Sequence, residues 1–139
     1  MAERLTEELL DELLSTSDLE GYLEERAPSG RTLSEYLQQL LAEKGLERSR
    51  VVRMANLNDT FGYQIFQGTR HPSRDKVLQI AFAMALTLRE TNRALKAAGA
   101  NELYCKDRRD AIIIFCLDRG YSLRKTDEEL YRFGEDTIC

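Results

Sequence analysis

Residues 45–73 read GLERSRVVRMANLNDTFGYQIFQGTRHPS. This stretch predicts two short helices that are joined by a tight turn and followed by a basic loop. Val51, Val52 and Ala55 recur at helical spacing and give the first helix one apolar face. Leu57 is the apolar residue of the turn.

The second of these helices has a recognisable beginning and end. Asn58 is a favourable N-cap, because its side chain can accept a hydrogen bond from a free backbone N–H. Gly68 supplies the left-handed residue that ends the helix, and Pro72 and Ser73 prepare the next one. A helix held steeply across its neighbour, with polar residues at its N-terminal end, is the device that places side chains in a DNA major groove.

The order of these residues resembles the lambda-repressor-like, or Xre-type, helix-turn-helix domains of bacterial and phage regulators. The matching elements are Gly45-Leu46, Gln64-Ile65, Gly68, Arg70, Pro72-Ser73 and the run Val77-Leu78-Gln79-Ile80-Ala81. The resemblance covers residues 32–99 and implies a five-helix domain. Two positions depart from the pattern. Val52 stands where the family usually has Ala, and Gly62 where it usually has a branched apolar residue, which weakens the helix by roughly 1 kcal/mol relative to Ala.

The resemblance also implies which residues would contact DNA. Base edges would be read by Asn58, Asp59, Thr60 and Gln64. Glutamine is suited to bidentate contact with adenine, aspartate can accept from cytosine, and threonine can touch a thymine methyl. Phosphates would be contacted by Arg48, Thr69, Arg70 and His71.

Two residues of the second helix test this interpretation. A carboxylate against DNA is costly, so Asp59 must either read a cytosine or pair with a neighbouring arginine. Phe66 stands where the family often has a polar residue, and an exposed Phe66 beside Tyr63 would favour a helix that faces a protein.

The distribution of charge supports DNA binding. The whole chain has a net charge of −4, which argues against indiscriminate nucleic-acid binding. By segment, the net charge is −6 over residues 1–31, +4 over residues 32–99 and −2 over residues 100–139. Since DNA affinity depends largely on neutralisation of phosphates by Lys and Arg, the positive segment coincides with the predicted motif.

Length and composition predict an all-α protein. The 139 residues include only eight glycines and two prolines, and charged residues alternate with Leu, Ala and Ile at helical spacing. No apolar run approaches the ~18 residues that span a bilayer, and Met1-Ala2-Glu3 does not begin a signal peptide. The three cysteines, Cys105, Cys116 and Cys139, are odd in number and lack metal-ligand spacing. We therefore expect a reduced, cytoplasmic bacterial or phage protein without cofactor or metal, with Cys116 in its core.

Candidate catalytic residues are scarce. His71 is the single histidine, and the chain has no Gly-rich phosphate loop and no nucleophile elbow. The carboxylate clusters Glu24-Glu25 and Asp127-Glu128-Glu129 lie on predicted amphipathic helices, where they read as solvated faces. We do not expect an enzyme.

Three segments follow from these patterns: an acidic amphipathic helical arm over residues 1–31, the helix-turn-helix domain over residues 32–99, and a helical hairpin over residues 100–139. A helix is expected over residues 4–14, and residues 27–30 form a linker. Capping boxes predict three further helix starts. They pair Ser17 with Glu20, Thr32 with Glu35, and Thr87 with Glu90.

The hairpin repeats the last two helices of the preceding domain. Residues 75–103 align with residues 110–138 at a constant offset of 35 and without a gap. The identical pairs are Asp75/Asp110, Leu88/Leu123, Arg89/Arg124, Thr91/Thr126, Leu95/Leu130 and Gly99/Gly134. Stacked hairpins bury apolar faces against each other. The second copy has surplus Ile and aromatic residues, which suggests a partner or self-association face. Its candidate contributors are Tyr121, Tyr131, Phe133 and Ile138.

Two functions of different classes remain open. The first is a transcriptional regulator that binds double-stranded DNA sequence-specifically. It would act as a homodimer, because one helix reads too few base pairs for useful specificity and the family usually employs two-fold symmetry. The second is a helical adaptor that keeps this fold and binds a protein partner through the acidic arm, Tyr63 and Phe66, or the C-terminal hairpin.

Overall fold

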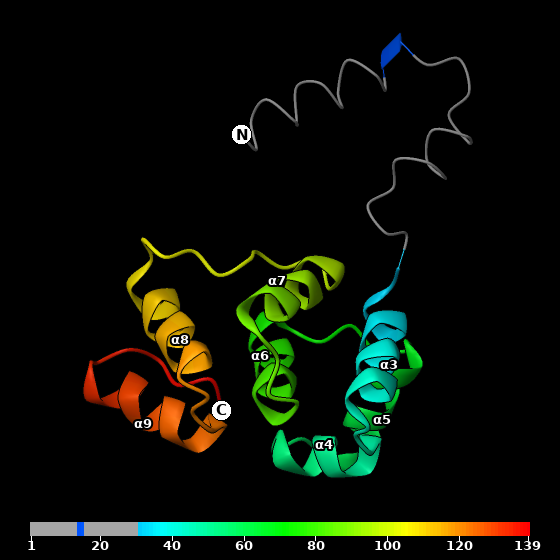
Figure 1. Ribbon diagram of the computed structural model, residues 1–139, viewed down its shortest axis with the longest axis horizontal. Coiled ribbons are helices and arrows are strands. Elements are labelled where there is room, and N and C mark those ends of the chain that lie inside the picture. The colour runs from blue at the N-terminus through cyan, green and yellow to red at the C-terminus, as the bar shows by residue number, and fades with distance from the viewer. Residues whose placement is uncertain (1–13, 16–30) are drawn as a thin grey trace. The chain divides into compact units, whose positions relative to one another are not determined.

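The computed structural model describes residues 14–15 and 31–139, and this part of the chain is helical and contains no strand. The predicted all-α class is therefore confirmed for the described residues. Seven helices follow residue 31 (Figure 1): α3 Leu33–Lys44, α4 Arg48–Met54, α5 Asp59–Gln67, α6 Arg74–Ala83, α7 Leu88–Ala97, α8 Arg108–Asp118 and α9 Leu123–Arg132.

The chain divides into two compact units, residues 1–31 and residues 32–139. In the first unit Leu14 and Ser15 are helical and exposed. The rest of the predicted helix over residues 4–14, the capping box at Ser17 and the linker at residues 27–30 lie outside the described residues. The two other capping boxes are confirmed, since Thr32 with Glu35 opens α3 and Thr87 with Glu90 opens α7.

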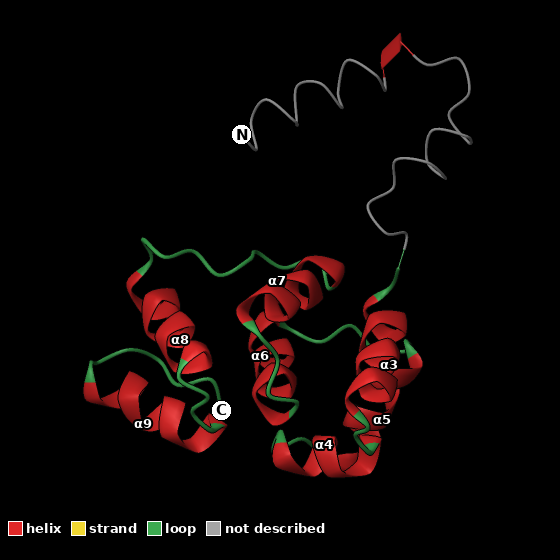
Figure 2. Cartoon of the chain, viewed as in Figure 1, coloured by secondary structure: helices red, strands yellow, loops and turns green. Residues whose placement is uncertain are grey.

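The α6–α7 hairpin is the central layer of the second unit. Figure 1 shows α3, α4 and α5 on one side of it and the α8–α9 hairpin on the other. Short loops join most neighbouring helices, whereas a longer loop leads from α7 to α8 (Figure 2). One apolar core runs through all three layers, and its fully buried members include Leu37, Ile65, Leu78, Ile113 and Leu130. Cys116 is buried in this core, as predicted.

The two hairpins are closed by hydrogen bonds at equivalent positions. In the first hairpin the Asn92 side-chain oxygen accepts from the backbone N–H of Leu103 at 2.8 Å. In the second, Asp127 Oδ1 accepts from the backbone N–H of Ile138 at 2.7 Å, at the same offset of 35. Ile138 is 4% exposed. The prediction that it lies on an exposed partner face is wrong, because this bond turns the returning loop inward over the core.

An arginine at the start of each hairpin also holds its returning loop. Arg74 opens α6 and Arg109 is the second residue of α8, and each guanidinium donates to two successive loop carbonyls. The bonds are Arg74 Nε to Asn101 O (2.9 Å), Arg74 Nη2 to Glu102 O (3.2 Å), Arg109 Nε to Asp136 O (2.9 Å) and Arg109 Nη2 to Thr137 O (3.2 Å).

The same two arginines join the hairpins to each other. Arg74 pairs with Asp110 at 2.8 Å, and Arg109 pairs with Asp75 at 3.1 Å. The helix contacts are reciprocal as well, since α6 contacts α9 and α7 contacts α8. Exchanging the hairpins leaves this set of contacts unchanged, which is the property of an isologous, two-fold interface. The repeat is therefore a closed pair and not the start of an open stack.

The buried Asp110 carboxylate should contribute more stability than its equivalent, Asp75. Its side chain is 8% exposed, against 40% for Asp75. We expect Asp110→Asn to lower the free energy of unfolding by about 2–4 kcal/mol, because it leaves the Arg74 guanidinium without a counter-charge. The matched control Asp75→Asn should cost less than about 1 kcal/mol. Urea unfolding at neutral pH measures both, and equal losses would contradict this ranking.

The contribution of Asp110 should also depend on pH. Burial alone would raise the pKa of Asp110, but hydrogen bonds from Arg74 and the Tyr104 N–H outweigh it and hold this pKa below its usual value. A carboxylate with a lowered folded pKa stabilises the protein above its unfolded pKa, and this gain is lost as the pH falls through the folded value. The stability difference between the native chain and Asp110→Asn should therefore shrink below about pH 4.

Candidate nucleic-acid interface

Helices α4 and α5 are joined by a turn at residues 55–58 that is anchored to α6. Ala55 caps α4 and is fully buried, and Asn56 adopts a left-handed backbone conformation with φ of 60°. Gln79 of α6 donates from Nε2 to the Ala55 carbonyl at 2.7 Å. This bond satisfies a carbonyl at the end of α4 and fixes the turn on the core.

The other end of α5 is held by α3. The Phe66 carbonyl accepts from Ser34 Oγ and from Gln38 Nε2, the latter at 2.7 Å. The Phe66 side chain is 1% exposed. The exposed Phe66–Tyr63 pair that would have favoured a protein-facing helix is therefore not formed. Gly68 ends α5 with φ of 87°, as its predicted role as a C-cap requires.

Val52 and Gly62, the two departures from the family pattern, compensate for each other in size. Gly62 is buried in α5 and faces Val52 of α4. A Cβ placed on Gly62 would overlap both γ-methyl groups of Val52. The larger residue on α4 thus occupies the volume that a side chain on α5 would need, so the two helices still pack closely without a void.

The exposed side of α5 is polar and carries most of the predicted base-reading residues. Thr60 and Tyr63 are exposed and Gln64 is half-buried. Gln67, also exposed, follows Gln64 by three residues and lies on the same stripe, although sequence reasoning did not select it. Its spacing of three from Gln64 and seven from Thr60 was the signal that could have identified it.

Asn58 has a role of its own. Its side-chain oxygen accepts from the backbone N–H groups of Thr60 and Phe61, at 2.9 and 3.2 Å, so the predicted N-cap is confirmed. Only the amide nitrogen of this side chain remains for a further contact.

Two arginines predicted to contact phosphate lie against this polar stripe. The Arg48 guanidinium, from the first residue of α4, stacks 4.1 Å from the centre of the Tyr63 ring. Arg70, from the loop after α5, donates from Nε to Gln64 Oε1 at 3.0 Å and lies 5.5 Å from the Phe61 ring centre. Stacking and hydrogen bonding hold these cations against side chains of α5 while both arginines remain exposed.

The remaining predicted residues are also at the surface. Asp59 is exposed in the first turn of α5, where the helix dipole favours an acidic side chain. Among residues 14–15 and 31–139, no Lys or Arg forms an ion pair with it. The Thr69 hydroxyl donates to the Gln64 carbonyl at 3.3 Å, and His71 is exposed in the following loop.

This arrangement provides hydrogen-bonding groups along one helix and cations beside it. Arg50 and Arg53 of α4 are exposed as well and add to the positive charge of the segment. Within the described part of the chain, no group of three His, Cys, Asp or Glu side chains could hold a metal ion. None of the described helices is long and apolar enough to cross a membrane.

Comparisons of the chain with protein-family models, with curated proteins and with solved structures find no match. The resemblance to lambda-repressor-like domains accordingly rests on the residues quoted above.

The complementary fit of Gly62 and Val52 predicts strong non-additivity. Gly62→Ala should destabilise the protein. The overlap with Val52 costs ~1–3 kcal/mol, as is typical of an overpacked core, and this loss exceeds the helix-propensity gain of roughly 1 kcal/mol. Val52→Ala alone should also destabilise it through the cavity that it leaves. The double variant should be more stable than the sum of the single effects predicts, by about 1–3 kcal/mol in a double-mutant cycle. Additive effects in urea unfolding would show that the two residues are not in contact.

Proposed function

We propose that the protein is a transcriptional regulator that binds duplex DNA sequence-specifically through α5, with α3 to α7 as a lambda-repressor-like five-helix domain. The observation that carries this proposal is the hydrogen bond from Arg70 to Gln64 beside the stack of Arg48 on Tyr63. They support the proposal because an amide suited to a base edge and two cations suited to phosphates belong to one surface of α5 and its neighbouring segments.

Gln64 is oriented for base reading before DNA arrives. Its side-chain oxygen, Oε1, accepts a hydrogen bond from Arg70, and this bond fixes the rotation of the side-chain amide. The oxygen keeps a second lone pair and the NH2 group keeps both protons, so the side chain can still accept from adenine N6 and donate to adenine N7. Because the amide is held in place, binding would not have to pay the entropy of ordering it.

Arg48 and Arg70 would set the position of α5 along the groove. Guanidinium groups bind phosphate oxygens with paired hydrogen bonds. The Tyr63 ring shields one face of Arg48 and leaves the N–H groups at its edge available. Thr69 and His71 extend the same surface into the loop after α5. Asp59, which has no cation partner within the described residues, would accept from a cytosine amino group.

The proposal predicts that replacing Gln64 and replacing Arg48 weaken DNA binding in different ways. Gln64→Ala should weaken binding to a duplex selected from a randomised pool by about 1–3 kcal/mol and relax the preference at one base pair. Arg48→Ala should weaken binding to the selected duplex and to a scrambled duplex alike, and reduce the slope of log affinity against log salt by about one. Fluorescence anisotropy at several salt concentrations measures all of these quantities.

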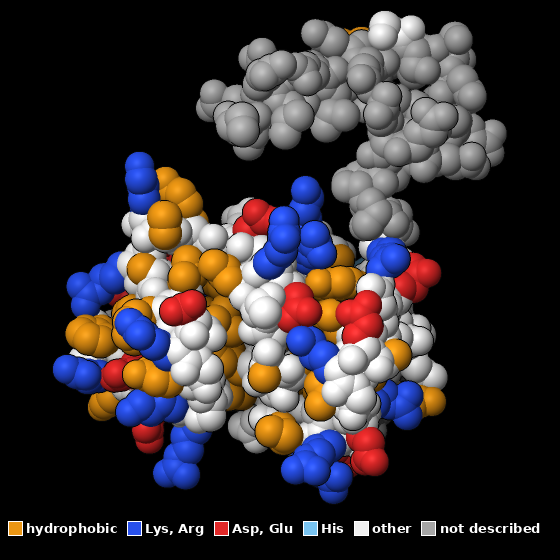
Figure 3. Space-filling view, in the orientation of Figure 1, with side chains coloured by type: hydrophobic (Ala, Val, Ile, Leu, Met, Phe, Trp, Pro, Cys, Tyr) orange, Lys and Arg blue, Asp and Glu red, His pale blue; other side chains and the backbone are white. Residues whose placement is uncertain are grey.

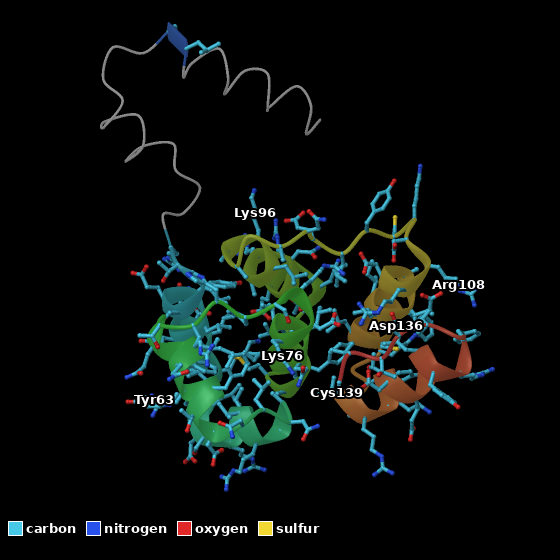
Figure 4. The ribbon with its side chains drawn as sticks, turned by 180° about the vertical axis from the view of Figure 1, so that it is seen from behind. Tyr63, Lys76, Lys96, Arg108, Asp136 and Cys139 are labelled. Carbon is cyan, nitrogen blue, oxygen red and sulfur yellow. The ribbon has the colours of Figure 1, made fainter. Side chains whose placement is uncertain are left out.

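Lys96→Ala is the matched control. It removes the same charge from α7, well away from Tyr63 (Figure 4), and should leave the selectivity and the salt slope nearly unchanged. If no duplex shows salt-dependent binding, DNA recognition is excluded and the helical adaptor becomes the better description. Equal losses of Gln64→Ala on selected and scrambled duplexes would remove Gln64 from base reading.

A further inference from the structure

The two hairpins are equivalent in sequence but not in what covers them. In the first hairpin α6 is packed against α4, and Gln79 bonds the end of that helix. At the offset of 35, Gln79 corresponds to Ile114 and Ile80 to Phe115. Ile114 therefore takes the place on α8 of the residue through which α6 holds the end of α4, and Phe115 takes the place of a fully buried residue.

Within residues 32–139 the side of α8 that carries Ile114 and Phe115 is uncovered and apolar. Ile80 is fully buried, whereas Phe115 is 48% exposed even though the Arg119 guanidinium stacks 4.6 Å from its ring centre. Ile112 and Ile114 are half-buried, while their equivalents in α6 are buried. Figure 3 shows hydrophobic side chains interspersed with Lys and Arg over the part of the surface formed by α8 and α9.

One charge at each end of α8 is placed against the helix dipole, although the caps Asp107 and Arg119 and the first-turn Asp110 are placed in favour of it. Arg108 is the first residue of the helix and Asp118 the last. A cation near an N-terminus and an anion near a C-terminus are both unfavourable by up to about 1 kcal/mol. Both side chains are exposed. The Arg108 side chain remains 66% exposed although its Nε pairs with Glu135 at 3.1 Å and its Nη2 donates to the Phe133 carbonyl at 2.8 Å.

We infer that α8 is the homodimer interface and packs antiparallel against α8 of a second copy of this chain. In that arrangement Arg108 of one copy lies beside Asp118 of the other, and the contact occurs twice around the two-fold axis. Each charge then meets both an opposite charge and the favourable end of the neighbouring helix dipole.

The same register brings complementary shapes together. When residue 108 faces residue 118, residue 111 faces residue 115. The small Ala111 of one helix therefore receives the large Phe115 ring of the other, again twice. A ring that fills the space above an alanine excludes water from the centre of the interface. An unrelated partner would not require that the two halves of one helix match each other in charge and in size.

This interface goes beyond the proposed function and does not depend on it. The α8 helix and the α5 helix are separate surfaces of the second unit, with the α6–α7 hairpin between them (Figure 1). Oligomeric state is measured without DNA, so a failure of the dimer and a failure of DNA binding are distinguishable.

The first experiment is sedimentation of the full chain under reducing conditions, because Cys105 and Cys139 are exposed and free. We expect a reversible dimer with a dissociation constant in the micromolar range, since a contact made mainly by one helix is small. Phe115→Glu should leave a folded monomer at about 100 µM. Met54→Glu, at a position 57% exposed at the end of α4, is the matched control and should remain a dimer.

The second experiment tests the antiparallel register by charge reversal. Asp118→Arg and Arg108→Asp should each raise the dissociation constant by about tenfold, because each places like charges together twice. The double variant should recover most of the native affinity. Circular dichroism of each variant checks that it is folded.

Three results would overturn the inference. They are a native chain that stays monomeric at about 100 µM, a folded Phe115→Glu variant that still dimerises, and a double charge reversal that restores no affinity.

Discussion

The burial of α6 on almost every side is the constraint on which the rest of the second unit depends. Six successive residues of this helix, Val77 to Phe82, are buried. A helix that is apolar all round must be covered on more than one side. Helices α3 to α5 cover one side of the α6–α7 hairpin and the α8–α9 hairpin covers another, so the candidate DNA-binding surface and the C-terminal repeat are attached to the same central element.

Burial on this scale explains the polar residue in the middle of α6. Gln79 is 1% exposed, and its amide nitrogen is committed to the Ala55 carbonyl. Its Oε1 has no hydrogen-bond partner within the described residues. An unsatisfied buried acceptor destabilises the fold by about 1–3 kcal/mol. The hydrogen bond from Nε2 of the same side chain offsets this loss, because it fixes the turn between α4 and α5. In the second hairpin there is no such turn to hold, and an isoleucine stands at the equivalent position.

Local features of this fold were predictable and paired features were not. The caps at Thr32, Asn58 and Thr87 depend on a few neighbouring residues, and the repeat depends on a fixed offset along the chain. By contrast, the fit of Gly62 against Val52 involves two helices. Each residue alone looks like an unfavourable departure from the family pattern, and only their contact shows that one compensates for the other.

The candidate site divides in the same way. The residue types along α5 could be selected from the sequence, but the bond from Arg70 to Gln64 could not, because it depends on the path of the loop after Gly68. Ile138 was misassigned for a related reason. Its apolar character is evident in the sequence, whereas its direction is set by Asp127, eleven residues earlier, which draws the backbone of the returning loop inward.

Exposed charged side chains lie on both surfaces at which this chain is expected to meet other molecules. Asp59 lies without a cation partner, within the described residues, on a segment whose net charge is +4. Arg108 and Asp118 stand at the ends of α8 that their charges disfavour. The isolated chain gains from two of these placements, because the dipole of α5 favours Asp59 and because Arg108 donates to the Phe133 carbonyl at 2.8 Å and pairs with Glu135 at 3.1 Å. Asp118, at the C-terminal end of α8, has no such benefit from its own helix dipole. A cytosine amino group beside α5 and a second copy of α8 would each give these exposed charges a further specific contact, and this is the reason for proposing both surfaces for binding.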